Sequence, residues 1–600
     1  MHSVRLSNML VLLALCCLTA PLTAQETPPN KAAEDDGGVP TKISAADPIR
    51  DLQNMAVAQK KSDFAWWGTD PSMWSNHTSH SNRLIPVYTF GTKGAGPGID
   101  LDSWFGPNSV YRSAEKLQKI YGYVPERTVS PNAIWMDQTN VYDIQAAAAV
   151  AGKKHIFLVV FDGMDWQTTQ AAAIWNSASV PYLYGRGSGT HFQSYTAGGT
   201  TQFGFFVTSP HNEGTDVDVD AQTVTNPGGT VRGGYDASVG GIAPWSVPVD
   251  PGYLITKGAA TSPKHAYTDS SSSASSMTAG IKTFNGAINV DASGGLVSTI
   301  AHQLQMKGWR VGAVSSVPIS HATPACTYAH NVARDDYQDL TRDMLGLKSI
   351  AHPDAPLPGM DVVIGGGYGV TAKSSDGVKK QGKNFVEGPS YLTEADLKTV
   401  DVQNGGQYVT AVRTAGKDGT EVLQTAAAAA AANGQRLLGF FGNGNTGGHL
   451  PFATANGSGQ PAVGGGKAES YTEADLTENP TLAEMTSAAL TVLGRDDKRF
   501  WLLVEPGDVD WANHDNNLDN SIGAVNSGDA AVRVITDWVE QHSNWKESLL
   551  IVTADHGHML NLAAPQKIAD QAARWKTHQK RAQNAAAGAA SPAKQEDEQK

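Results

Sequence analysis

The stretch HIFLVVFDGMDW at residues 155–166 decides the fold class of this chain. Its first part is a short, almost wholly apolar run that stops at an Asp-Gly turn, which is typical of a strand buried on both faces of a parallel sheet. The residues that follow, 166–175, have the pattern of a helix. A buried strand followed at once by a helix indicates an α/β protein.

Helices and buried strands continue to alternate toward the C-terminus. We therefore expect an α/β fold with a central, mainly parallel β-sheet flanked by helices. Two stretches rich in Gly, Thr and Asp, 185–262 and 366–420, break the alternation, and we expect inserted loops or a small accessory subdomain there. The predicted helices cover 294–307, 421–432, 480–494 and 519–542, and the predicted strands cover 310–316, 361–365, 436–441, 500–505 and 548–555.

The composition limits both the domain organisation and the partners. With 40% apolar residues and no long linker in the middle of its 600 residues, the chain is expected to form one large domain with insertions. Its formal net charge of −13 disfavours nucleic acid as a partner, because phosphate backbones select basic surfaces. The 62 glycines indicate many Gly-rich loops.

The first 24 residues have the pattern of a secretory signal peptide, so we expect an exported protein that is periplasmic or secreted. An apolar run over 9–18 is followed by small residues up to Ala24. The run is too short to span a bilayer, so no transmembrane anchor is expected. A lipid anchor on Cys16 or Cys17 is the alternative, although the leucine before Cys16 fits such a site poorly.

The remaining terminal segments have a different composition from the core. Residues 25–60 are predicted to be a flexible leader, and residues 563–600 a C-terminal helix followed by a disordered tail. Removal of the signal leaves only Cys326, so no internal disulfide is expected.

Carboxylates stand at the ends of three predicted strands. In open α/β sheets the ligand crevice lies at the carboxyl ends of the strands, so these acids predict a binding site there. Each acid alone is more often a turn or cap residue than a functional one. Together with nearby imidazoles they suit Zn²⁺, and the additional carboxylates suit Mg²⁺. The strand-end acids are Asp162, Glu505 and Asp555, and their neighbours are Asp510, His514 and His556.

Ser270 is a candidate nucleophile. It follows Asp269 and opens a predicted helix of small residues that extends to about Ile281. The positive end of that helix would hold an oxyanion beside the hydroxyl. The alternative is an N-cap followed by a tightly packed helix with no chemistry.

These residues together resemble the alkaline phosphatase family. The matching motifs are the Ser270 segment with KTFNG at 282–286, DGM at 162–164, HATPACTYAH at 321–330, the spacing of Glu505, Asp510 and His514, and TADH at 553–556. They occur in the family's order over residues 155–560.

The resemblance implies a role for each matching residue. Ser270 would be the nucleophile, and Arg334 and Asp269 would bind the phosphate group, Arg334 through its forked guanidinium. His321 and Trp511 stand where family members vary, which leaves the metal preference and the pH optimum open. The implied metals are two Zn²⁺, one held by Asp162, Asp555 and His556 at Ser270 and the other by Asp510 and His514, and one Mg²⁺ held by Asp162, Thr323 and Glu505, with His321 beside it.

One zinc-ligand histidine of the family is absent from its usual place near the C-terminus. WSNHTSHSNRLIPVYTFGTKG at 74–94 resembles the family's late segment, so we expect a circular permutation in which residues 61–154 carry that histidine and the closing helix ahead of a core over 155–562. His80 fits better than His77. The alternative is that both are loop histidines and that His558 holds the zinc, or that the zinc is absent.

The implied activity is hydrolysis of phosphate monoesters through a phosphoserine, with release of inorganic phosphate. A phosphodiesterase or sulfatase of the same superfamily is a weaker alternative, because Ser270 and Arg334 favour monoesters. A non-catalytic phosphate-binding protein is another, but the ligand inventory argues against it. A homodimer stays open.

Overall fold

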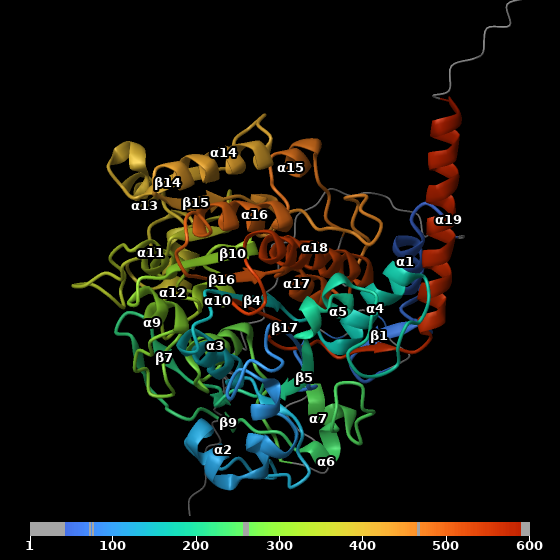
Figure 1. The fold of residues 1–600 in the computed structure, drawn as a ribbon, viewed down its shortest axis with the longest axis horizontal. Coiled ribbons are helices and arrows are strands. Elements are labelled where there is room, and N and C mark those ends of the chain that lie inside the picture. The colour runs from blue at the N-terminus through green and yellow to red at the C-terminus, as the bar shows by residue number, and fades with distance from the viewer. Residues whose placement is uncertain are drawn as a thin grey trace, which may run out of the picture.

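The computed structural model describes residues 43–70, 74, 77, 79–255, 263–464 and 468–589, so the predicted signal peptide lies outside the described residues. Its centre is a ten-stranded sheet with the strand order β14-β15-β11-β10-β16-β4-β17-β2-β5-β3 (Figure 1). Helices cover both faces of this sheet. The predicted α/β class with a central, mainly parallel sheet is confirmed.

Seven neighbouring strands run parallel and form one side of the sheet. The apolar run at 155–161 forms β4, which pairs with β17 from His155↔Ser548 to Phe161↔Ala554. Both strands are buried along their whole length, which explains their unbroken apolar sequences. The seven strands are β14 (Tyr408–Val412), β15 (Arg436–Phe440), β11 (Val362–Gly366), β10 (Arg310–Pro318), β16 (Phe500–Glu505), β4 (His155–Phe161) and β17 (Ser548–Ala554).

The other side of the sheet begins with a strand from the N-terminal part of the chain. β2 (Ile85–Phe90) runs antiparallel between β17 and β5 (Gln202–Val207), and β3 (Met136–Asp137) follows parallel to β5. All six residues of β2 are buried. Residues 85–90 are therefore an internal strand of the sheet, although they precede β4 by more than sixty residues.

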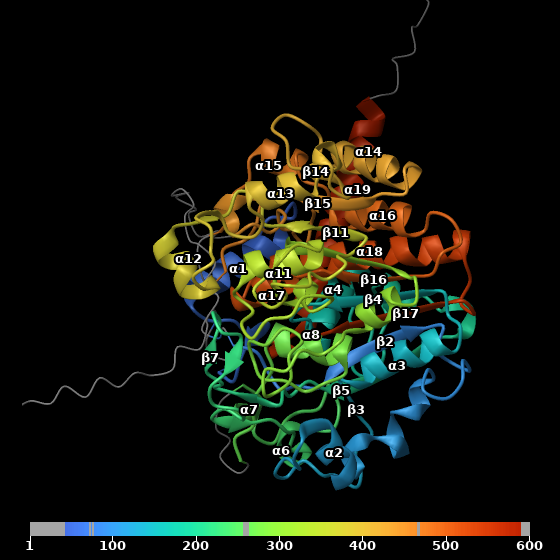
Figure 2. The ribbon, with the colours of Figure 1, turned by 90° about the vertical axis from the view of Figure 1, so that its left-hand side faces the viewer.

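Two helix layers enclose the sheet, one on each of its faces, while the sheet itself extends from β14 near the top of both ribbon views to β5 in their lower part (Figure 2). Within each layer neighbouring helices pack on one another, α16 against α14 and α18 in the first, and α8 against α3 and α10 in the second. The first layer contains α4 (Trp166–Ser177), α14 (Gly419–Ala432), α16 (Leu482–Leu493) and α18 (Leu518–His542), and the second contains α3 (Asn140–Val150), α8 (Ser270–Ala279), α9 (Ile300–Gln305) and α10 (Ala322–Ala325). Helix α19 (Pro565–Ala589) packs on α4 at the edge of the molecule (Figure 1).

Three expectations need correction. The leader expected over 25–60 does not extend that far, because α1 (Pro48–Gln59) buries Ile49 and Ala56 against α18 and α19. The two stretches expected to be inserted loops are partly core, since β5 lies in the first and β14 in the second.

The helix predicted over 294–307 is shorter than expected. It begins only at Ile300, where Thr299 forms a capping box with His302. The glycine pair at 294–295 is a turn, and Gly294 has φ +87°, which favours glycine.

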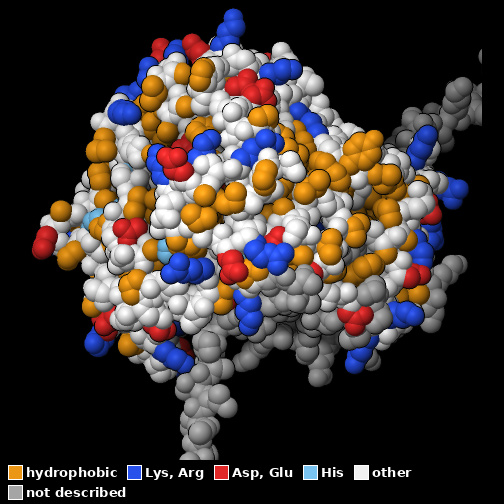
Figure 3. All heavy atoms as spheres, turned by 90° about the horizontal axis from the view of Figure 1, so that it is seen from below, with side chains coloured by type: hydrophobic (Ala, Val, Ile, Leu, Met, Phe, Trp, Pro, Cys, Tyr) orange, Lys and Arg blue, Asp and Glu red, His pale blue; other side chains and the backbone are white. Residues whose placement is uncertain are grey.

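The surface seen from below carries Lys, Arg, Asp and Glu side chains interspersed with apolar ones (Figure 3). Among the described residues, no helix combines the length and the apolar character that a membrane crossing requires.

Candidate active site

The three predicted strand-end carboxylates meet at one edge of the sheet. Asp162 follows β4, Glu505 ends β16, and Asp555 follows β17. Because β16, β4 and β17 are adjacent and parallel, their carboxyl ends lie side by side. All three side chains are buried.

Ser270 opens helix α8 and points toward these acids. Its Oγ lies 3.4 Å from Asp162 Oδ1 and 3.3 Å from His556 Nε2. Asp269 caps the helix by accepting a hydrogen bond from the Ser272 N–H at 2.9 Å. The cap residue thus fixes the first turn and directs the serine hydroxyl into the site.

His556 joins the serine to two carboxylates. Its Nε2 lies 3.2 Å from Asp162 Oδ1 and 3.5 Å from Asp555 Oδ2. The three side chains are suited to hold one metal ion, because one ligand atom of each lies within 4.8 Å of the others. The structure therefore assembles the first set of zinc ligands that the resemblance implies.

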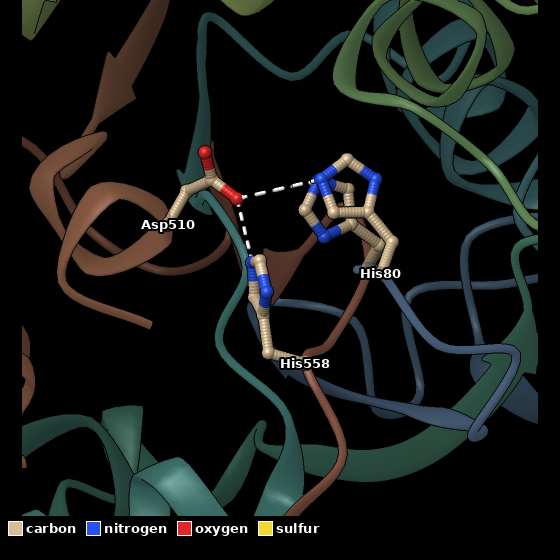
Figure 4. A group of neighbouring side chains, drawn as sticks. His80, Asp510 and His558 are labelled. Atoms are coloured by element: carbon tan, nitrogen blue, oxygen red, sulfur yellow. Dashed lines mark hydrogen bonds and ion pairs between the residues drawn. The ribbon is translucent and has the colours of Figure 1, made fainter. Parts of the chain in front are cut away.

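Asp510 stands at the centre of a second group, in which four imidazoles approach its Oδ1. Figure 4 shows two of them, His80 and His558, beside Asp510. Its helix α17 (Asp508–His514) also carries one of them, since His514 lies one turn later. The Nε2 atoms lie at 2.6 Å for His558, 3.4 Å for His514, 3.7 Å for His80 and 3.8 Å for His556.

His80 reaches this group from the N-terminal segment. Its Nδ1 lies 2.8 Å from the Thr268 carbonyl, which can only accept, so Nδ1 carries the proton and Nε2 presents its lone pair. That Nε2 lies 3.2 Å from His514 Nε2, and the ring stacks on His556. The structure therefore places His80 in the second group of ligands.

The two alternatives to His80 lie in different environments. His77 is outside the group, and its backbone N–H donates to Asn516 Oδ1. His558 belongs to the group together with His80, not instead of it. Sequence reasoning treated His558 only as a substitute ligand, although its position two residues after His556 in an extended segment was a signal that both rings could approach one site.

The third set of predicted residues surrounds Glu505. Burial raises the pKa of Glu505 to about 7, while the Ser315 hydroxyl, which donates to its Oε2, and the neighbouring His321 and Thr323 act in the opposite direction. His321 and Thr323 lie at the beginning of α10. Ser315 was missed by sequence analysis, because no motif marks a serine inside β10.

The electrostatics of the site favour a cation. Burial raises the pKa of Asp162, and the nearby carboxylates of Asp510 and Glu505 raise it further. Burial and Asp162 likewise raise the pKa of Asp555. Among the described residues, the buried atoms Asp162 Oδ2, Glu505 Oε1 and Asp555 Oδ2 accept no hydrogen bond. Crowded, buried carboxylate oxygens without donors fit divalent metal ions, which would supply the missing positive charge.

Arg334 is held beside the serine by Asp269. Its Nη1 lies 3.2 Å from Asp269 Oδ2, and its backbone N–H donates to the Gly286 carbonyl. The same carboxylate oxygen accepts from the Ser271 hydroxyl and the Gly286 N–H. Asp269 thus orients both the helix that begins with Ser270 and the guanidinium of Arg334.

The N-terminal segment also fixes the two core elements of the site. Gln138 donates from Nε2 to Ser273 Oγ at 2.8 Å and to the Asp555 carbonyl at 2.9 Å. Lys282 Nζ lies 3.2 Å from Asp137 Oδ2, and both side chains are fully buried. These contacts tie the residues before β4 to helix α8 and to the end of β17.

Comparison with known proteins identifies the family of the chain. The family model of alkaline phosphatase matches residues 253–597, which is more than half of the chain. The chain therefore belongs to the alkaline phosphatase family, as its motifs predicted. Asp162 and His80 lie outside the matched range, whereas the other predicted site residues lie within it.

Individual relatives are distant and are matched only in part. The alkaline phosphatase of Escherichia fergusonii is 29% identical over 316 residues, which cover 50% of this chain and 59% of the relative. Alkaline phosphatase 4 of Bacillus subtilis is 26% identical over 297 residues, which cover 49% of this chain and 50% of the relative. The chain thus spans between half and three fifths of the length of these relatives. The solved structure of a cold-active alkaline phosphatase from Shewanella sp. aligns with this chain with a TM-score of 0.38 and 21% identity. The alignment covers 67% of this chain and 68% of the chain in that structure.

Proposed function

We propose that the protein is an alkaline phosphatase that hydrolyses phosphate monoesters and releases inorganic phosphate through a covalent phosphoserine at Ser270. The observation that carries this proposal is the position of the Ser270 hydroxyl, which lies within 3.4 Å of both Asp162 and His556 at the carboxyl end of the sheet. A hydroxyl in such a setting is an activated nucleophile in the general sense of covalent catalysis.

The chain's own residues divide the work. Arg334 binds two phosphate oxygens through its guanidinium, and Asp269 keeps that guanidinium in place. The Ser270 oxygen attacks phosphorus, the bond to the leaving alcohol breaks, and the phosphoryl group is transferred to the serine. A water then cleaves the phosphoserine, and Ser270 is regenerated.

The ligand sets fit two Zn²⁺ and one Mg²⁺. Asp162, Asp555 and His556 would hold one zinc, Asp510 and His514 with His80 would hold the other, and Asp162, Thr323 and Glu505 would hold magnesium beside His321. Bound there, the ions would lower the pKa of the serine hydroxyl and of water and would neutralise charge on the phosphate. Activity is expected to rise toward alkaline pH, because the ligands and both nucleophiles must be deprotonated.

We also infer that residues 61–154 occupy the place of the family's C-terminal segment. Support comes from the antiparallel pairing of β2 with β17, from the helix α3 that leads into β4, and from the approach of His80 to Asp510. Strands, once in place, pack in the same way whichever end of the chain supplies them. Export to the periplasm or the medium is part of the same proposal.

The test is hydrolysis of p-nitrophenyl phosphate by the wild type, with and without a chelator, and by Ser270→Ala. We expect chelation to abolish turnover and Ser270→Ala to lower kcat by at least about 10³-fold. Ser276→Ala is the matched control, because the Ser276 hydroxyl donates back to the Ser272 carbonyl inside α8. Chelator-resistant turnover, or full activity without Ser270, would contradict the proposal.

A further inference from the structure

A further group of side chains that could bind a metal is separate from the groups around Ser270 and Asp510. His330 stands in the loop after α10, Asp343 in α11 (Tyr337–Leu345), and His352 in the loop that follows α11. One ligand atom of each lies within 4.8 Å of the others. His330 Nδ1 is 3.0 Å from His352 Nε2, and His352 Nε2 is 3.8 Å from Asp343 Oδ2.

The protonation of His330 prepares it as a ligand. Its Nε2 lies 2.9 Å from the Val297 carbonyl, which can only accept, so the proton of the neutral ring is on Nε2 and the lone pair is on Nδ1. Burial lowers the pKa of His330 to about 4, so the ring is neutral at physiological pH. A histidine whose second ring nitrogen donates to a backbone carbonyl is the arrangement typical of metal ligands.

Asp343 is the acidic member of the group, and burial raises the pKa of its carboxyl to about 7, so a bound cation would favour the ionised form. Its side chain is fully buried, and its Oδ2 accepts from the His330 backbone N–H at 3.0 Å while the Ser349 hydroxyl donates to its Oδ1. In the described part of the chain, no Lys or Arg forms an ion pair with Asp343, whose only ionisable partner is His352. A buried carboxylate between neutral imidazoles lacks a compensating charge.

We propose that His330, Asp343 and His352 form a metal site for Zn²⁺ that is separate from the Ser270 site. Two imidazoles and one carboxylate are ligands that zinc prefers, and three protein ligands leave a fourth position for water. Two nitrogens bound to one tetrahedral zinc lie about 3.3 Å apart, given Zn–N distances of about 2.0 Å. The 3.0 Å between His330 Nδ1 and His352 Nε2 is close to that separation.

The position of the group suggests what the ion would stabilise. His330 is four residues before Arg334, and the loop between them is anchored by the bridge of Asn331 to Ile288. A zinc ion would join this loop to α11 and to the segment after it. The ion would thereby restrict the motion of the loop that leads to Arg334. His352 is partly exposed, with 14% of its side-chain surface accessible, which gives the ion a route from solvent.

The experiment measures zinc bound per chain in the full-length protein after dialysis against buffered zinc. His352→Ala and Asp343→Asn are each expected to hold one equivalent less than the wild type, whereas His578→Ala, an exposed histidine on α19, is expected to hold the same amount. Zinc should also raise the Tm of the metal-free wild type more than that of either site variant. The same loss is expected in an Asp510→Ala background, which separates this site from the Ser270 site.

Two results would overturn the site. One is equal zinc content in the wild type, His352→Ala and Asp343→Asn. The other is a lower Tm in His352→Ala with unchanged zinc content, which would assign the 3.0 Å contact to a hydrogen bond between the rings. Asp343→Asn preserves the volume of the buried side chain, so it decides the question if His352→Ala does not fold. Because zinc content is read without substrate, failure here is distinguishable from failure of the proposed phosphatase activity.

Discussion

Residues 79–154 and residues 253–597 contribute to one site in different ways. The second region matches the family model and contains Ser270, Arg334 and most of the metal-ligand candidates. The first lies outside that match, yet it supplies His80, the internal strand β2 and the contacts of Gln138 with Ser273 and Asp555. A region without a family match therefore contributes a side chain and supporting contacts to the site.

Two charge pairs can be compared, one between the two regions and one inside the matched region. Lys282 and Asp137 pair across the boundary between the two regions, and both are fully buried. His449 and Glu469 pair inside the matched region, with His449 Nε2 3.2 Å from Glu469 Oε1 and its ring against Trp511. A variant of the first pair measures how strongly the two regions depend on one another, and a variant of the second measures a pair within one region.

The largest effect is expected from Lys282→Met, which leaves Asp137 buried and without its partner. Loss of one member of a buried ion pair costs about 3–5 kcal/mol, measured as the free energy of unfolding in urea. Lys154→Met is the matched control, since Lys154 pairs with Glu547 at the surface and should cost less than about 1 kcal/mol. Equal losses in the free energy of unfolding for the two variants would show that the boundary pair stabilises the protein no more than a surface pair does.

A smaller and pH-dependent effect is expected from His449→Gln. Burial disfavours the charged ring, but Glu469 and Asp508 outweigh it and raise the pKa of His449 from 6.5 to about 9. Because the pKa is higher in the folded state, the stabilisation is complete below pH 6.5 and is lost as the pH rises through about 9. It amounts to about 3 kcal/mol. The measurement is the free energy of unfolding in urea at pH 6 and at pH 10. If the difference in this free energy between wild type and His449→Gln is the same at both pH values, the stabilisation does not come from the charged ring of His449.

The smallest effect is expected from Gln138→Ala, which removes two buried hydrogen bonds between the regions. We expect a loss of about 1–2 kcal/mol in the free energy of unfolding. A decrease in kcat should accompany it, because Ser273 and the Asp555 carbonyl lose their common donor. Gln566→Ala on the exposed face of α19 is the control, with no change expected. Unchanged stability and kcat in Gln138→Ala would assign the segment no role in positioning the site.

Local sequence patterns predicted six of the seven parallel strands, all except β14. The apolar runs of β4, β16 and β17 needed no long-range information, because strands buried on both faces are apolar throughout. The place of β2 between β17 and β5 could not be read in the same way, since pairing between distant segments leaves no local signal. The helix α1 was missed because its buried face is narrow and its sequence is otherwise polar.

The residues at the strand ends and at the start of α8 were predicted from the sequence, whereas the residues that support them were not. Strand-end acids and the helix that begins at Ser270 follow from general rules for α/β sheets, and the structure places them together. The contacts of Ser315 with Glu505 and of Gln138 with Asp555 depend on neighbours far apart in the sequence, so no motif indicated them. His558 likewise acquires its place beside Asp510 from tertiary packing.

We propose that the imidazole of His80, from the N-terminal region, completes a metal group built by the matched region. The most direct test is the zinc content of His80→Ala and His77→Ala, measured with their p-nitrophenyl phosphate hydrolysis. We predict that His80→Ala binds less zinc and loses at least about 10–100-fold in kcat/KM, whereas His77→Ala retains both. Wild-type zinc content in His80→Ala would show that the imidazole of His80 is not a zinc ligand.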